Sequence, residues 1–124
     1  MAINVQGDLL VWGRNANGLL GDGTLENRYA PVKIMENVVY IVAGYSHSIA
    51  ITADGMLWGW GRNVNGQLGI GTTESQYTPV PILDDVVTVA LGLHHTIALT
   101  SEGVLWDWGS NWSGQLGDSP SQYA

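Results

Sequence analysis

Cysteine is absent from the 124-residue sequence. The disulfide frameworks of small secreted domains are therefore excluded, although some secreted proteins also lack cysteine. No apolar run approaches the roughly 18 residues of a membrane-spanning helix, and the first residues, MAINVQGDLL, lack both the basic start and the long apolar stretch of a signal peptide. We therefore expect neither a transmembrane segment nor a signal peptide, and the sequence assigns no cellular location.

Basic residues are also scarce. The sequence has four basic and eleven acidic residues, which gives a net charge of -7. Such a charge repels phosphate backbones and anionic lipids, so we expect no direct binding to nucleic acid or membrane. The chain is 45% hydrophobic and only 12% charged, a composition typical of a folded globular domain and not of a disordered chain.

The sequence is dominated by an internal repeat of 48 residues. Trp12, Trp60 and Trp108 head the segments WGRNANGLLGDGT, WGRNVNGQLGIGT and WGSNWSGQLGDSP. Upstream, AGYSHSIAITADGMLWGWG matches LGLHHTIALTSEGVLWDWG, and AINVQGDLLVWG matches the later part of both. We therefore expect a single repeat domain over 1–124, with a partial repeat at 2–35, a full repeat at 36–83 and a partial repeat at 84–124.

The pattern within each copy predicts strands. SIAIT and TIALT alternate aliphatic with small or polar residues, the period of a strand buried on one face. Gly7, Gly55 and Gly103 follow at positions where a short hairpin needs a positive backbone angle, and a second strand returns after each. NVVYIVAG and APVKI supply two more strands. The sequence therefore predicts an all-β fold of β-propeller blades, each with about four antiparallel strands, in roughly two and a half repeats per chain.

The segment HTIALTSEGVLWDWGSNWSGQLG, matched by HSIAITADGMLWGWGRNVNGQLGIGT, resembles the regulator of chromosome condensation repeat. The resemblance implies a propeller, commonly of seven blades. Members of that family include a guanine nucleotide exchange factor for a small nuclear GTPase and a plant ultraviolet-B photoreceptor, but a fold transfers better than a function. Tyr45 and Leu93 stand where the photoreceptor motif GWRHT has tryptophan, which argues against light sensing.

Residues that recur with the repeat are predicted to be structural. Trp12, Trp58, Trp60, Trp106 and Trp108 are expected to pack between sheets, where aromatic side chains bury large areas. His47 and His95 recur just before a strand and are expected to tie blade loops together by hydrogen bonds. In the loops, a turn-forming role is predicted for the asparagines and glycines that recur, which are Asn15, Asn63, Asn111, Gly18, Gly66 and Gly114.

The sequence does not fit several catalytic and binding motifs that parts of it resemble. The loop after Trp12 lacks the lysine of a phosphate loop and the glycine spacing of a dinucleotide fingerprint. Calcium is disfavoured because Asp22 is replaced by Ile70 in the second copy. Ser46 resembles a hydrolase nucleophile, yet His94 replaces it in the next copy and no helix follows. We expect no catalytic residue, cofactor or metal, and therefore no enzyme.

The function favoured by the sequence is a non-enzymatic protein-interaction scaffold. Fewer than three blades do not close a propeller, so we expect completion by homo-oligomerisation or within a longer propeller. Alternative functions are a small-ligand or carbohydrate-binding module and an exchange factor for a small GTPase. The protein partner is unidentified, and its candidate contacts are positions where the copies differ, namely Tyr45, Ser46, Leu93, His94 and Trp112.

Overall fold

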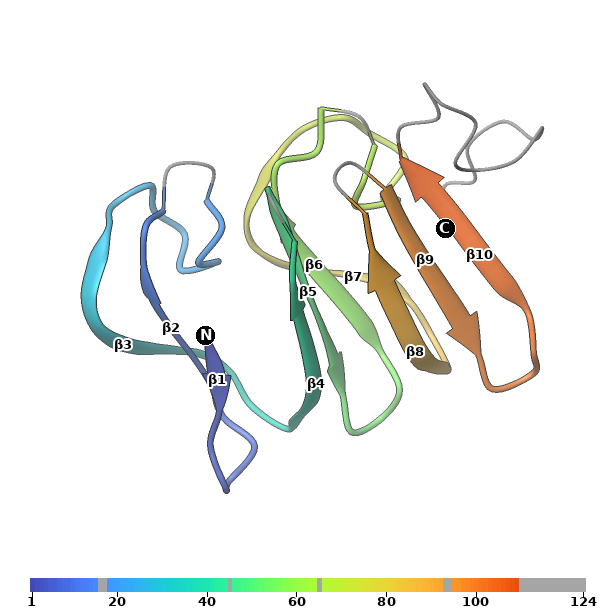
Figure 1. Ribbon diagram of the computed structural model, residues 1–124, viewed down its shortest axis with the longest axis horizontal. Helices are drawn as coiled ribbons and strands as arrows, with labels where there is room; N and C mark the ends of the chain where they lie inside the picture. The colour runs from blue at the N-terminus through green and yellow to red at the C-terminus, as the bar shows by residue number, and fades with distance from the viewer. Residues whose placement is uncertain (16–17, 45, 65, 93–94, 110–124) are drawn as a thin grey trace.

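The computed structural model describes residues 1–15, 18–44, 46–64, 66–92 and 95–109, and the regular elements in these ranges are all strands (Figure 1). The described residues contain no helix that is long and apolar enough to cross a membrane. The strands form three antiparallel sheets, here called blades 1 to 3. Blade 1 contains β1 (Ala2–Ile3), β2 (Leu9–Gly13) and β3 (Arg28–Met35). Blade 2 contains β4 (Val38–Ala43), β5 (His47–Thr52), β6 (Leu57–Gly61) and β7 (Gln76–Leu83). Blade 3 contains β8 (Val86–Leu91), β9 (His95–Thr100) and β10 (Leu105–Gly109).

The predicted all-β fold with four strands in the full repeat is confirmed. Blade 2 has the strand order β4-β5-β6-β7, and every neighbouring pair is antiparallel. β1 to β3 of blade 1 correspond in sequence to the last three strands of blade 2, whereas β8 to β10 of blade 3 correspond to the first three. The sheets therefore follow the 48-residue repeat.

The hairpin turns of the three blades lie along one edge of the molecule, called the turn edge (residues 4–8, 52–56 and 100–104, with the links 36–37 and 84–85). Gly7 and Gly55 have φ of 86°, which fits the positive backbone angle that the sequence predicted. Each of these two turns is also hydrogen-bonded to the start of the next blade. Val38 N donates to Gly7 O at 2.8 Å, and Val86 N donates to Gly55 O at 2.9 Å. The opposite ends of the strands carry the longer loops, including 14–27 and 62–75, and form the loop edge.

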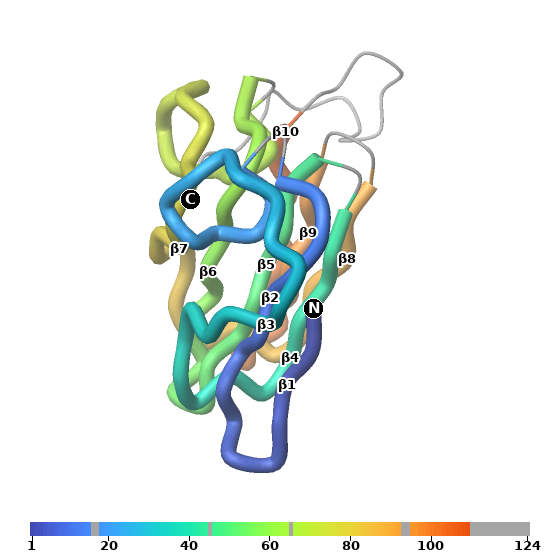
Figure 2. Tube along the Cα trace, turned by 90° about the vertical axis from the view of Figure 1, so that its left-hand side faces the viewer, coloured from blue at the N-terminus to red at the C-terminus, as the bar shows by residue number. Residues whose placement is uncertain are grey.

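The blades pack face to face and bury a core in each interface. Cross-strand register places Trp58 opposite Ala50 and Leu57 opposite Ile51, so the two pairs point to opposite faces of blade 2. One face, called the front, packs its tryptophans on blade 1, in a core that includes Leu9 and Val11. The other face, called the rear, packs Leu57 and Ile51 on blade 3, where Trp108 completes the core. Figure 2, viewed from the blade 1 side, shows the sheets stacked behind one another.

Candidate functional site

A tryptophan on the front of each following blade closes the interface with the preceding blade. Trp60 Nε1 donates to Leu19 O at 2.8 Å, and Trp108 Nε1 donates to Gln67 O at 2.8 Å. Both indoles are fully buried, with 0% exposure. Their hydrogen bonds to backbone carbonyls satisfy the indole N–H inside an apolar core, which would otherwise cost free energy on burial. The loop of one blade is therefore part of the next blade's core.

Trp12 occupies the same repeat position but differs from the core packing expected of it. Its side chain is 43% exposed. The difference has a simple physical reason, since no loop of a preceding blade lies against the front of blade 1 in the described structure. Burial of this tryptophan is thus a property of the interface between blades and not of the blade itself.

A buried asparagine forms hydrogen bonds across the described parts of the loops 14–27 and 62–75. Asn63 Nδ2 donates to Thr72 O at 2.9 Å and to Glu74 O at 3.0 Å, while its Oδ1 accepts from Leu68 N at 2.9 Å. Asn15 makes the equivalent bonds in blade 1, and both asparagines are 0% exposed. Gly18 and Gly66 follow with φ of 69° and 71°, and Asn111 and Gly114 lie outside the described residues.

His47 links blade 2 to blade 3 through a short polar chain. The Thr96 hydroxyl donates to Gln67 O at 2.7 Å, so its oxygen is left to accept a hydrogen bond from His47 Nε2 at 3.0 Å. His47 therefore carries its proton on Nε2, because a hydroxyl has one proton to give. Thr96 occupies the repeat position of Ser48, whose hydroxyl donates to Leu19 O at 3.3 Å in the preceding interface. His95 begins β9 and is partly buried.

Blade 1 adds an ion pair to its loop. Arg28 Nε lies 2.6 Å from Asp22 Oδ2, and the Asp22 side chain is only 4% exposed. Burial acts to raise the pKa of Asp22, but hydrogen bonds from Arg28, Thr24 and Asn15 outweigh it and lower the pKa to about 2. Ile70 stands at this position in blade 2, so the ion pair is not a feature of every blade.

The Asp22 carboxylate gives a testable pH dependence. Because its folded pKa lies below the ordinary value of 3.8, its contribution is present above about pH 4 and is lost as the pH falls towards 2. We expect Asp22→Asn to lower the free energy of unfolding at pH 7 by roughly 2 kcal/mol. In urea denaturation the gap to the wild type should shrink below pH 4. Glu74→Gln, in the equivalent loop of blade 2, serves as the control, and an equal loss there would contradict the role of Asp22.

Most of the predicted partner contacts fall outside the described residues, namely Tyr45, Leu93, His94 and Trp112. The fifth, Ser46, is described and is 1% exposed. Its hydroxyl has no hydrogen-bond partner among the described residues, and the Ser46 carbonyl accepts from Arg62 N at 2.8 Å. Ser46 therefore presents no side-chain surface to a partner in this conformation.

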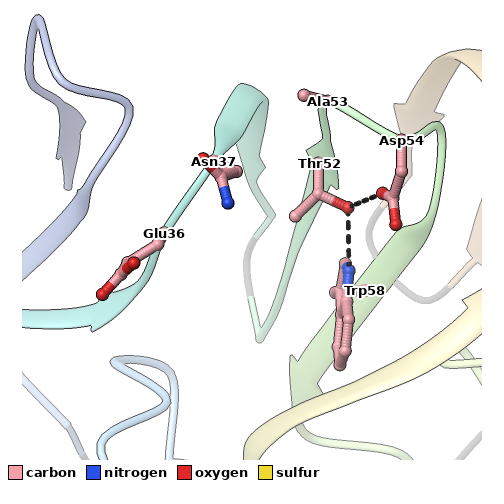
Figure 3. Close-up of a pocket in the computed structure, with 6 residues that line it drawn as sticks. All are labelled: Glu36, Asn37, Thr52, Ala53, Asp54 and Trp58. Atoms are coloured by element: carbon pink, nitrogen blue, oxygen red, sulfur yellow. Dashed lines mark hydrogen bonds between the residues drawn. The ribbon is translucent and has the colours of Figure 1, made fainter.

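A pocket at the turn edge recurs in two blades. The first has a volume of about 350 Å³ and is lined by Glu36, Asn37, Thr52, Ala53, Asp54 and Trp58 (Figure 3). There the Thr52 hydroxyl lies between the Asp54 carboxylate, to which it donates, and Trp58 Nε1, from which it accepts at 3.2 Å. The second, of about 170 Å³, lies at the same place in blade 3, and its lining includes Asp84, Glu102 and Trp106, the equivalents of Glu36, Asp54 and Trp58.

The turn edge is strongly acidic, whereas the loop edge is balanced. The carboxylates at the turn edge are Asp8, Glu36, Asp54, Asp84, Asp85 and Glu102. Lys33 is the one base near them in the described structure, and its Nζ lies 2.9 Å from Glu36. At the loop edge the described acids Asp22, Glu26 and Glu74 are matched by Arg14, Arg28 and Arg62.

The turn-edge pockets were not predicted from the sequence. Hydrogen bonds from the Thr52 hydroxyl and the Met56 N–H lower the pKa of Asp54 below its ordinary value. Among the residues described here, no three His, Cys, Asp or Glu side chains are grouped as a metal site. The repeat did contain a signal for these pockets, because acidic residues recur at the 48-residue spacing. Glu36 corresponds to Asp84, and Asp54 corresponds to Glu102. An indole beside carboxylates is an arrangement that attracts cations.

Comparison with known proteins identifies the repeat. Two models of the regulator of chromosome condensation (RCC1) repeat match the chain, one over residues 6–51 and 54–99 and the other over residues 38–67 and 86–115. The ultraviolet-B receptor UVR8 of Arabidopsis thaliana is 38% identical over 56 residues, which cover 42% of this chain and 13% of the receptor.

Solved structures show the same fold. Human WBSCR16 matches 86% of this chain with a TM-score of 0.77 and 26% identity. Prp20p of Saccharomyces cerevisiae, studied for its binding to Gsp1p and histones, matches 98% with a TM-score of 0.80 and 24% identity. Yeast RCC1 (Prp20) bound to Kap60 gives a TM-score of 0.78 at 26% identity. The chain spans 29% of the WBSCR16 chain and 34% of the Prp20p chain, so the fold of part of a propeller is what these structures share with it.

Proposed function

The chain belongs to the regulator of chromosome condensation repeat family, and from this premise we propose that it is a non-enzymatic scaffold that binds a basic protein partner. Further repeats complete its ring, supplied by other copies of the chain or within a longer propeller. The chain spans 13% of the ultraviolet-B receptor, 29% of WBSCR16 and 34% of Prp20p, so the activities of these whole proteins are not carried over.

The rigidity expected of a scaffold is supported by the repeated contacts between blades. Each described interface contains an apolar core and a buried tryptophan whose indole N–H donates to a loop carbonyl of the preceding blade. The links at the turn edge add backbone hydrogen bonds from Val38 and Val86 to the preceding hairpin turns. A stack fixed in this way holds its edges in a constant geometry, which is what a binding surface on a repeat protein requires.

The acidic turn edge is the main reason for proposing a basic partner. Its two pockets combine carboxylates with the indoles of Trp58 and Trp106, one blade apart. Lysine and arginine side chains are attracted both to carboxylates and to the faces of aromatic rings. A net charge of -7 further speeds the encounter with a basic partner. The binding of Prp20p to histones, which are basic proteins, is consistent with this choice of partner.

A non-catalytic role is supported by the surroundings of Ser46 and His47. A hydrolase nucleophile must reach its substrate, but Ser46 is only 1% exposed. His47 Nε2 donates to the Thr96 hydroxyl of the next blade. Its ring therefore acts as a link between blades.

Binding of a labelled lysine-rich peptide, followed by fluorescence anisotropy, tests the proposal. We expect saturable binding that weakens with salt, and the double variant Asp54→Asn with Glu102→Gln should weaken it about fivefold by removing one charge from each pocket. Glu26→Gln with Glu74→Gln removes two charges from the loop edge and should change the affinity less than twofold. Equal losses in the two variants, or no saturable binding, would contradict the turn-edge site.

Two further assays separate the alternative functions. If the chain accelerates nucleotide release from a small GTPase, it is an exchange factor and the scaffold proposal is replaced. Glycan-array binding that is lost in Trp112→Ala and kept in Val64→Ala, at the same repeat position in blade 2, would instead make it a carbohydrate-binding module. For the scaffold we expect neither result.

A further inference from the structure

The two turn-edge pockets differ in whether the chain itself supplies a cation. They are called here the blade 2 pocket, lined by Trp58, and the blade 3 pocket, lined by Trp106. Beside the blade 2 pocket, Lys33 Nζ lies 2.9 Å from Glu36 Oε1 and 3.9 Å from Asp8 Oδ1. The hydrogen bond to Glu36 and the charges of Asp8 and Glu36 raise the pKa of Lys33. A lysine of blade 1 is therefore the counter-ion at this pocket.

The blade 3 pocket has carboxylates but no such cation. Pro81 stands at the repeat position of Lys33, three residues before the acid of the link. The lining carboxylates belong to Asp84, Asp85 and Glu102, and in the described structure none of the chain's four basic residues forms an ion pair with them. Three negative charges therefore share this pocket without a counter-ion, and they repel one another.

The acid of the hairpin turn is also less engaged in the blade 3 pocket. In blade 2 the Thr52 hydroxyl donates to the Asp54 carboxylate (Figure 3). In blade 3 the corresponding Thr100 hydroxyl is hydrogen-bonded to the Val104 backbone, whose N–H donates to it at 3.2 Å. Within the described ranges no group donates a hydrogen bond to the Glu102 carboxylate. Glu102 is therefore left to bind a group from outside the chain.

We propose that the blade 3 pocket receives a lysine side chain of the basic partner, as the counter-ion that Lys33 already provides at the blade 2 pocket. This assignment rests on the proposed function and goes beyond it by naming one pocket and one side chain. The repeat is its own comparison, because the acid of the link is paired with a lysine in one blade and lacks it in the next. The blade 2 pocket contributes less, since a partner lysine would first have to displace Lys33 from Glu36.

A lysine side chain also suits the blade 3 pocket in size and in character. The volume of about 170 Å³ lies below the roughly 300 Å³ at which pockets for small-molecule ligands begin, and it matches the end of one side chain. The ammonium group relieves the repulsion among the three carboxylates. The methylene stem can pack along the Trp106 ring, and the ring face attracts the charge.

Fluorescence anisotropy with the labelled lysine-rich peptide and the full chain tests which pocket makes the contact. Glu102→Gln is expected to weaken binding about fourfold, because it removes a carboxylate that has no partner within the chain. Asp54→Asn makes the equivalent change in the blade 2 pocket and should alter the affinity less than about 1.5-fold. Far-ultraviolet circular dichroism confirms that each variant is folded.

Pro81→Lys tests the place of the missing cation. It brings a lysine to the position from which Lys33 reaches its acid, so the new side chain should occupy Asp84 and weaken peptide binding about threefold. Leu25→Lys adds the same charge at a position of the loop edge that is 52% exposed, and should leave the affinity within about 1.5-fold of the wild type. Pro81→Gln, which removes the proline without adding a charge, should do the same.

Lys33→Gln is expected to have the opposite effect. It frees Glu36 and should strengthen peptide binding about twofold, because the blade 2 pocket then lacks its counter-ion as well. In this background Asp54→Asn should weaken binding more than it does in the wild type. Arg14→Gln removes the same charge from the loop edge and is the control, expected to change the affinity less than about 1.5-fold.

The possible results separate this assignment from the proposed function. The assignment is overturned if Asp54→Asn weakens binding as much as Glu102→Gln, or if Pro81→Lys weakens it no more than Leu25→Lys. In both cases the scaffold function stands, because the wild type still binds the peptide. An affinity that Lys33→Gln leaves unchanged contradicts the role of Lys33 as counter-ion. Absence of saturable binding to the wild type overturns the scaffold proposal and the assignment together.

Discussion

Replacing Trp60 with alanine is expected to lower the free energy of unfolding by about 4 kcal/mol. The indole is 0% exposed, so its removal leaves a cavity in the core between blades 1 and 2. The change also leaves the Leu19 carbonyl without the hydrogen bond that it accepts from Trp60 Nε1 at 2.8 Å. Urea denaturation followed by tryptophan fluorescence and circular dichroism measures the loss.

Trp12→Ala is the matched control because it makes the same substitution at the same repeat position. With its side chain 43% exposed and no loop against it, the loss is expected to stay below about 1.5 kcal/mol under conditions where the chain is monomeric. A similar loss for both variants would show that the tryptophan stabilises the blade itself. A large difference assigns its contribution to the interface.

Gly69→Ala is expected to destabilise the protein by at least about 3 kcal/mol, through two separate effects. The backbone of Gly69 has φ of +68°, and holding alanine in that region costs about 1–2 kcal/mol. In addition, the new Cβ would lie 2.7 Å from the buried indole of Trp108, which has no room to retreat inside the core. The loop would have to move away from blade 3, and the hydrogen bond from Trp108 to Gln67 would lengthen.

Gly71→Ala separates the two effects. Gly71 also has a positive φ, +83°, but a Cβ there meets nothing within 4 Å. Its loss should therefore be only the backbone cost of about 1–2 kcal/mol. If Gly69→Ala cost no more than Gly71→Ala in thermal and urea denaturation, close contact with Trp108 would be ruled out as the reason for glycine at position 69.

The predictable part of the fold came from local patterns. Alternating residues such as those of SIAIT gave the strands, and glycines such as Gly55 gave the turns. The 48-residue spacing then placed each strand in a blade. Asn15 was predicted to help form the turn, and in the structure its side chain donates to the carbonyls of Thr24 and Glu26 in the same loop. These features could be predicted from the sequence because their physical causes lie within one repeat.

The candidate site was harder to predict because it depends on contacts between repeats. Trp12 and Trp60 sit in nearly identical sequence, yet one is exposed and the other is buried, since only Trp60 has a preceding blade in the described structure. Ser46 was proposed as a contact from its variation between copies, but variation does not report burial. The acidic pockets were equally hidden, because their carboxylates come from a link and from a turn that only the fold brings together.

The sequence by itself determined the repeat, the all-β fold, the negative charge and the positions of the turns, because each follows from residue type and spacing along the chain. Tertiary structure alone decided which tryptophans are buried, that His47 bonds to Thr96 of the next blade, and that acids 18 residues apart share one pocket at Glu36 and Asp54. The physical reason is that burial and the clustering of charges depend on which residues the fold brings together. The local sequence pattern does not show which residues are neighbours in space.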